Sequence, residues 1–180
     1  MDQTNSANDV LLQARGVTKT YTTGVTAVTA LRGVDLDVRA GDLITVMGPS
    51  GNGKTTLLNC LSGIDSIDSG SVIIDELDIH AMRDGARTQH RAERMGFIFQ
   101  SFNLIPVLSA RENVEIPLGI LGMSPNESKD RANTMLQRVG LGDRGDHRPQ
   151  ELSGGEQQRV AIARALVTEP AIVWLSLIHI

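Results

Sequence analysis

The chain has 180 residues, of which 41% are hydrophobic and 21% charged, and its formal net charge is −4. These values predict one folded domain, and the 17 basic against 21 acidic residues give no basic excess of the kind that binds nucleic acid. One cysteine, Cys60, excludes an internal disulfide, and no stretch approaches the roughly 20 apolar residues that span a bilayer. We therefore expect a cytoplasmic protein without nucleic-acid partners that reaches a membrane only through another protein.

The first half of the chain predicts mostly strands. Residues 1–9 are polar and predict a disordered tail that precedes a domain over 10–180. A helix is expected over 54–61, because apolar residues recur there at helical spacing. The expected strands are 10–21, 25–31, 34–38, 71–75 and 95–99, together with a buried strand over 42–47.

The second half predicts helices. Ser109 and Ser124 each precede a glutamate by three residues, which is the spacing of a capping box at a helix start. Pro117 is expected to kink or end the first of these helices, and Gly140 to stop the second. Residues 101–150 are therefore expected to form a helical subdomain inserted in a mixed α/β core.

The run Gly48-Pro-Ser-Gly-Asn-Gly-Lys-Thr-Thr56 has the spacing of a phosphate-binding loop, and it lies between an expected strand and an expected helix. In such loops backbone N–H groups and a helix N-terminus surround a phosphate. Lys54 would neutralise β- and γ-phosphate charge, and the Thr55 hydroxyl would bind Mg²⁺. An ordinary glycine turn is the alternative, but it leaves the flanking strand and helix unexplained. The expected nucleotide-binding residues are Gly48, Pro49, Ser50, Gly51, Asn52, Gly53, Lys54, Thr55 and Thr56.

A second motif, Leu152-Ser-Gly-Gly-Glu-Gln-Gln-Arg, begins another helix. It could simply be a capped helix start, because Ser153 and Glu156 have capping-box spacing. However, Gly154 and Gly155 are poor helix formers, each costing about 1 kcal/mol relative to alanine. Bare backbone at the positive end of a helix favours an anion, so these four residues predict a second phosphate contact. Two such helix starts fit one nucleotide best when two chains pair head to tail.

The two motifs, with Gln100 between them, resemble the ATP-binding subunits of ATP-binding cassette (ABC) transporters over about residues 10–174. The resemblance implies an α/β fold of the P-loop NTPase type: a RecA-like core, an antiparallel β subdomain and a helical insert. It implies ATP and Mg²⁺ as cofactors, Tyr21 stacking on adenine, Gln100 contacting Mg²⁺ and the attacking water, and Lys54 and Gln100 as the catalytic residues.

The same resemblance implies a second ATP-binding subunit, in a homodimer, and a transmembrane permease as partners, with the protein at the inner face of the cell membrane. Three segments are similar to the lipoprotein-release and macrolide-exporter subgroup: Phe102–Pro106, Glu112–Val114 and His147–Pro149. A cassette ATPase of DNA repair or translation is disfavoured, because the gap between Gln100 and Leu152 is too short for a long coiled-coil insert.

The family pattern breaks after Trp174. Ser176 and Leu177 stand where the family has the Asp and Glu that support Mg²⁺ and activate water. Residues 175–180, Leu-Ser-Leu-Ile-His-Ile, also match the translation of a transposase sequencing adaptor. The resemblance implies an ATPase that energises a permease when its C-terminus is complete. For this chain we expect a fold that is incomplete at the C-terminus, a non-native tail over 175–180, weak nucleotide binding and almost no hydrolysis. The alternative is an authentic end, which would make the protein a non-hydrolytic nucleotide-binding module.

Overall fold

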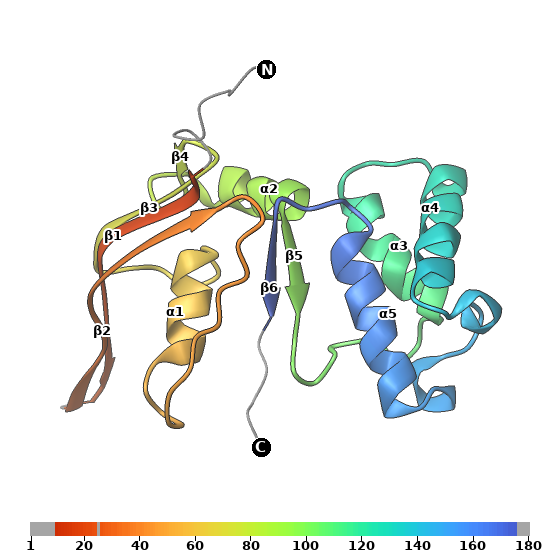
Figure 1. Cartoon of the computed structure of the whole chain (residues 1–180), viewed down its shortest axis with the longest axis horizontal. Helices are drawn as coiled ribbons and strands as arrows, with labels where there is room; N and C mark the ends of the chain where they lie inside the picture. Colours follow the sequence, from red (N-terminus) through yellow and green to blue (C-terminus); the bar gives the residue numbers. More distant parts are fainter. Residues whose placement is uncertain (1–9, 25, 176–180) are drawn as a thin grey trace, which may run out of the picture. The chain divides into compact units, whose positions relative to one another are not determined.

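The computed structural model describes residues 10–24 and 26–175, and contacts divide the chain into two compact units, Met1–Arg87 and Thr88–Ile180. The first unit contains an antiparallel sheet and one helix, whereas the second is mainly helical (Figure 1). This mixed α/β composition agrees with the fold class expected from the sequence. None of the helices formed by the described residues has the length and apolar character to cross a bilayer.

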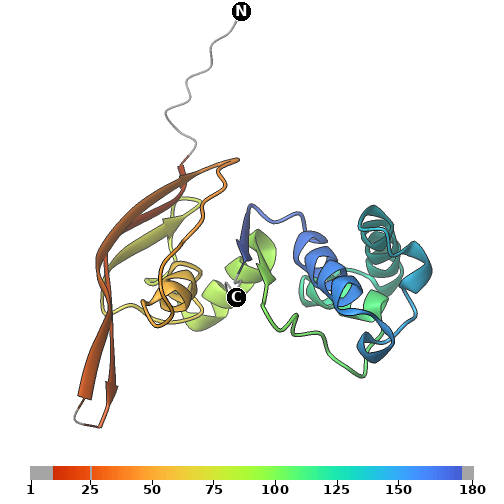
Figure 2. The same ribbon diagram turned by 60° about the horizontal axis from the view of Figure 1, so that its bottom comes forward.

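The sheet of the first unit has the strand order β2-β1-β3-β4. Its strands are β1 (Val10–Thr23), β2 (Thr26–Arg39), β3 (Ser69–Ile74) and β4 (Leu77–Asp78). β1 and β2 form a long antiparallel hairpin in both ribbon views (Figures 1 and 2). The two short strands predicted over 25–31 and 34–38 are thus one continuous strand, with register shifts in its pairing. Gly33 lies inside it at φ 79°, a conformation that glycine adopts without strain.

The helix of this unit, α1 (Lys54–Leu61), has the bounds that the sequence predicts. Cys60 and Leu61 at its end are buried, and Leu57 and Leu58 are half-buried. Burial also raises the pKa of the Cys60 thiol to about 11. The buried apolar side chains of the unit are Leu12, Ala14, Val17, Leu31, Cys60, Leu61, Val72, Ile74 and Ile79.

The prediction of a buried strand over 42–47 is wrong. The structure assigns no strand there, neither sheet includes these residues, and Leu43 and Met47 are 95% and 81% exposed. The apolar composition alone does not make a strand, because a β-strand needs a hydrogen-bonded neighbour to satisfy its N–H and C=O groups. No strand of the described residues pairs with this segment.

The second unit has a two-stranded parallel sheet, β5 (Met95–Ile98) and β6 (Ile172–Leu175), in which Phe97 pairs with Trp174. The helix α2 (Asp84–Arg94) precedes β5 and spans the boundary between the units. Gly96 is buried in β5, and a Cβ atom at this position would overlap the carbonyl group of Ala165. Its missing side chain therefore allows strand and helix backbones to pack closely.

Three helices, α3 (Ala110–Ile120), α4 (Pro125–Arg138) and α5 (Gly154–Leu166), lie side by side in both views (Figures 1 and 2). They share one core with two short 3₁₀ turns, Gly142–Arg144 and Pro149–Glu151, next to it. The buried members of this core are Ala110, Val114, Leu118, Ala132, Met135, Leu136, Leu141, Leu152, Val160, Ala163 and Val167.

The helix starts follow the capping signals of the sequence. Ser109 and Glu112 form the reciprocal capping box, whereas at Ser124 the structure gives only the hydroxyl that accepts a hydrogen bond from the Glu127 N–H group. Pro117 does not end α3, which continues for three more residues. Leu118, fully buried after the proline, explains this, because packing of the last turn outweighs the hydrogen bond that proline removes.

Gly96→Ala should lower the free energy of unfolding by about 1–3 kcal/mol, because backbone atoms must shift to admit the methyl group. Gly119→Ala, in open space on α3, is the matched control and should raise it by about 0.4–1 kcal/mol. Urea denaturation followed by circular dichroism measures both. Equal effects from the two substitutions would contradict the close packing of β5 on α5.

Candidate functional site

The loop before α1 takes its shape from glycine. Gly48, Gly51 and Gly53 have φ angles of 151°, 82° and 77°, which residues with a side chain rarely adopt. At Gly53 a second constraint applies, because a Cβ atom there would lie 2.7 Å from the carbonyl oxygen of Ala30 in β2. Gly53 therefore lets α1 begin directly against the sheet.

The N-terminus of α1 has no side-chain cap, unlike those of α3, α4 and α5. Its first-turn N–H groups have no acceptor within the helix, and no acidic side chain lies in this turn. The helix dipole adds positive potential at the same place. The arrangement is that of an anion-binding helix start, and phosphate is the anion that the loop sequence predicts.

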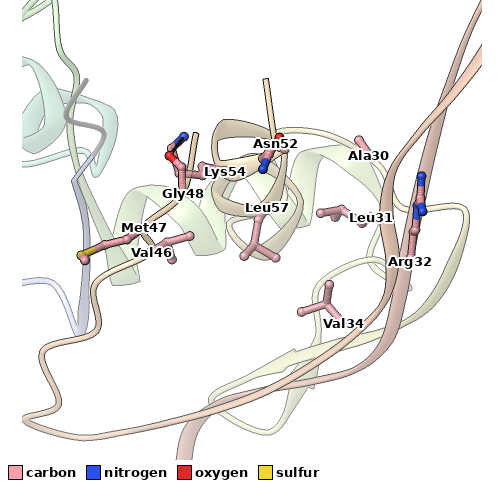
Figure 3. Close-up of a pocket in the computed structure, with 11 residues that line it drawn as sticks. Ala30, Leu31, Arg32, Val34, Val46, Met47, Gly48, Asn52, Lys54 and Leu57 are labelled. Atoms are coloured by element: carbon pink, nitrogen blue, oxygen red, sulfur yellow. Dashed lines mark hydrogen bonds between the residues drawn. The ribbon is translucent and has the colours of Figure 1, made fainter. Parts of the chain in front are cut away.

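Lys54 folds back over the loop. Its ammonium group donates hydrogen bonds of 2.7 Å to the carbonyl oxygens of Gly48 and Pro49. Next to the loop is a pocket of about 390 Å³, and Figure 3 shows Lys54 and Gly48 at one side of it. The loop residues Gly48, Asn52, Gly53 and Lys54 form part of its lining, and apolar side chains form most of the rest. The lining residues are Ala30, Leu31, Arg32, Val34, Val46, Met47, Gly48, Asn52, Gly53, Lys54 and Leu57.

Tyr21 is held by the segment that follows α1. Its hydroxyl donates a 2.6 Å hydrogen bond to Oδ2 of Asp65, four residues after the end of α1. The bond to Asp65 raises the pKa of Tyr21 and lowers that of Asp65. Thr55, by contrast, is exposed at the helix start, as a metal-binding hydroxyl would need to be. Asp65 was missed by the sequence analysis, because no motif spacing connects it to Tyr21.

The second helix start caps itself. Oε2 of Glu156 accepts two hydrogen bonds from Ser153, one from the hydroxyl at 2.7 Å and one from the N–H group at 2.8 Å. In return, the Ser153 hydroxyl accepts a hydrogen bond from the Glu156 N–H group. These bonds lower the pKa of Glu156, and Arg144 approaches its other oxygen at 3.5 Å. Gly154 and Gly155 are exposed, and a Cβ atom at Gly154 would meet open space. The glycines therefore leave room for a ligand rather than for a neighbouring part of this unit.

Gln100 is exposed in the turn that follows β5. Phe102 and Asn103, which follow Ser101, have φ angles of 58° and 48°. This left-handed backbone conformation costs free energy in residues with a side chain. Arg164 of α5 donates one hydrogen bond of 2.6 Å to the carbonyl oxygen of each of these two residues. Burial lowers the pKa of this guanidinium group. Arg164 thus holds the segment after Gln100 on the helix that Ser153 begins, another link that the sequence did not reveal.

The expected site residues are distributed between the two units. Tyr21 and the loop from Gly48 to Thr56 belong to Met1–Arg87, and Gln100 and Ser153–Glu156 belong to Thr88–Ile180. Ser176 and Leu177, which stand at the positions of the family carboxylates, lie outside the described residues.

Known proteins are similar to this chain in both sequence and fold. A family described as ABC transporter matches residues 31–175. The lipoprotein-releasing system ATP-binding protein LolD of Chromohalobacter salexigens is 46% identical over 92% of this chain and 70% of its own length. An uncharacterized ABC transporter ATP-binding protein of Mycobacterium tuberculosis is 47% identical over 85% of this chain but only 46% of its own. A dimeric ATP-binding cassette, solved in a post-hydrolysis state bound to ADP and Pi, is 43% identical with a TM-score of 0.84, covering 91% of this chain and 72% of that one.

Arg164→Lys should loosen the segment Phe102–Asn103, because lysine keeps the charge but cannot donate in two directions from a planar group. We expect faster amide exchange in a peptide covering 99–104 and a loss of about 1–3 kcal/mol of stability. Arg159→Lys, on the exposed side of α5, is the matched control. Unchanged exchange in Arg164→Lys, measured by mass spectrometry, would refute the anchoring role.

Proposed function

Since the chain belongs to the ABC transporter family as an ATP-binding protein, we propose that it binds MgATP at Gly48–Thr56 and that ATP use by its dimer energises a membrane permease. In this proposal Lys54 and the first-turn N–H groups of α1 bind the β- and γ-phosphates. Thr55, with Gln100, binds Mg²⁺, and Tyr21 stacks on adenine. Residues 10–180 act as one ATP-binding domain, whose helical part over 101–150 faces the permease.

The observation that carries this proposal is the uncapped start of α1. Three glycines shape the loop, no side chain occupies the helix N-terminus, and the ammonium group of Lys54 lies on the loop carbonyls. A triphosphate would replace these carbonyls as the partner of Lys54. The exchange favours the nucleotide, because the ammonium group would then face a negatively charged oxygen, which adds Coulombic attraction that a neutral carbonyl lacks.

A second copy would supply the other phosphate contact, from its Ser153, Gly154, Gly155 and Glu156. In this proposal the Ser153 hydroxyl, which donates to Glu156 in the structure, turns toward the γ-phosphate. The exposed glycines support such a close approach. The dimeric cassette structure with 43% identity supports the pairing of two copies.

The relatives support a proposal for the cargo and the location. Several related proteins are ATP-binding proteins of lipoprotein-releasing systems, so we propose export of the lipoprotein or macrolide type. The protein would then act in the cytoplasm, at the inner face of the cell membrane. The permease selects the substrate.

A second candidate function differs from the first in whether the protein hydrolyses ATP. Ser176 and Leu177 cannot supply the carboxylates that the family uses, so the alternative is a module that binds ATP without turning it over. Measuring MgATP turnover of the chain beside the Ser176→Asp/Leu177→Glu variant tests the two candidates. Turnover gained by the variant supports a hydrolytic site that lacks only its carboxylates, whereas turnover by the unchanged chain would refute the non-hydrolytic alternative.

Lys54→Ala should weaken ATP binding by about 10- to 100-fold, because a charged hydrogen bond to phosphate contributes about 1.5–3 kcal/mol. Isothermal titration calorimetry with ATP measures the affinity. Lys129→Ala, an exposed lysine on α4, removes the same charge and should leave affinity unchanged. If both variants bind ATP as the parent chain does, Gly48–Thr56 is not the phosphate site.

A further inference from the structure

A group of polar side chains fixes the hydroxyl of Tyr21. The Asp65 carboxylate accepts from Tyr21 through Oδ2 at 2.6 Å, and through Oδ1 from Lys19 Nζ at 3.1 Å and from the Ser66 N–H group at 2.8 Å. Lys19 also donates to Oγ of Ser66 at 3.1 Å. Both oxygens of Asp65 are thus occupied, which fixes the carboxylate and, through it, the phenol.

Lys19 acts on the ring itself. Its ammonium group lies over the Tyr21 ring, 5.2 Å from the centroid, within the range of a cation–π contact. Lys19 is only 7% exposed, whereas Tyr21 is 40% exposed. Burial by itself lowers the pKa of Lys19, but the hydrogen bond and the charge of Asp65 outweigh it and raise the pKa, so this ammonium group stays charged. A base can therefore stack only on the ring face opposite Lys19.

The chain connects this group to the phosphate loop. Lys19 and Tyr21 are two residues apart on β1 and project from the same side of the strand. Asp65, which accepts the hydrogen bond of the Tyr21 hydroxyl, follows α1, the helix that begins at Lys54. The orientation of the ring is thus tied to the helix whose start would bind the phosphates.

We propose that Lys19 and Asp65 are positioning residues that hold the Tyr21 ring as a one-sided platform for the base of a nucleoside triphosphate. This inference rests on the proposed function, which gives Tyr21 its stacking role. A ring already fixed loses little side-chain entropy when the base binds, so the two residues set the base-dependent part of the affinity. They contribute nothing to the contacts with the phosphates.

The test compares ATP with inorganic triphosphate, which lacks a base, on the full chain. Asp65→Asn should raise the Kd for ATP about threefold or more, because Asp65 and Tyr21 are in direct contact and contacting residues are energetically coupled. The Kd for triphosphate should stay unchanged. Asp37→Asn is the matched control, because Asp37 also pairs with a cation, Arg15, but does not contact Tyr21. The ratio of the two Kd values in one variant is insensitive to any unfolded fraction, so a destabilised variant still gives an answer.

A double-mutant cycle completes the test. In a Tyr21→Ala background, Asp65→Asn should no longer change the Kd for ATP. Equal losses for ATP and triphosphate, or an undiminished effect without Tyr21, would overturn the positioning role. A parent chain that binds both ligands equally well would also overturn it while leaving the phosphate site intact. If neither ligand binds the parent chain, the proposed function fails, and this inference fails with it.

Discussion

The close approach of α1 to β2 is the constraint on which the unit Met1–Arg87 depends. Gly53 lies just before the helix. A Cβ atom added to it would lie 2.7 Å from the carbonyl oxygen of Ala30, so only glycine fits at this position. This contact fixes where the helix N-terminus lies and therefore where its N–H groups point. The far end of the same helix leads to Asp65, which holds Tyr21. One short helix thus places both the phosphate-binding loop and the aromatic ring.

The two helix starts with anion-binding sequences are in different electrostatic conditions. At α1 neither a cap nor an acidic side chain opposes an incoming phosphate. At α5 the Glu156 carboxylate lies in the first turn and accepts two hydrogen bonds from Ser153. A phosphate must compete with that carboxylate at α5 but not at α1. This difference agrees with a loop that binds nucleotide first and a second helix that joins only when another copy approaches.

Local signals in the sequence predicted local structure well. The bounds of α1 and the capping box of α5 follow from residues within one turn of each helix start, and both are confirmed. The strand expected over 42–47 failed because a strand depends on a neighbour distant in the sequence, which no local pattern specifies. For the same reason Asp65 and Arg164, 44 and 62 residues from the groups they bond, could not be found from spacing. The roles of the nucleotide-binding residues stay predictions.

The buried sulfur of Cys60 has a practical consequence. With a thiol pKa of about 11 and no exposed surface, its sulfur stays protonated and shielded at neutral pH. Because the chain has no other cysteine, a thiol-alkylating dye in solution reacts only with molecules in which the surroundings of Cys60 at the end of α1 have opened. The protein thus carries an intrinsic reporter of opening in its first unit, and no label needs to be introduced.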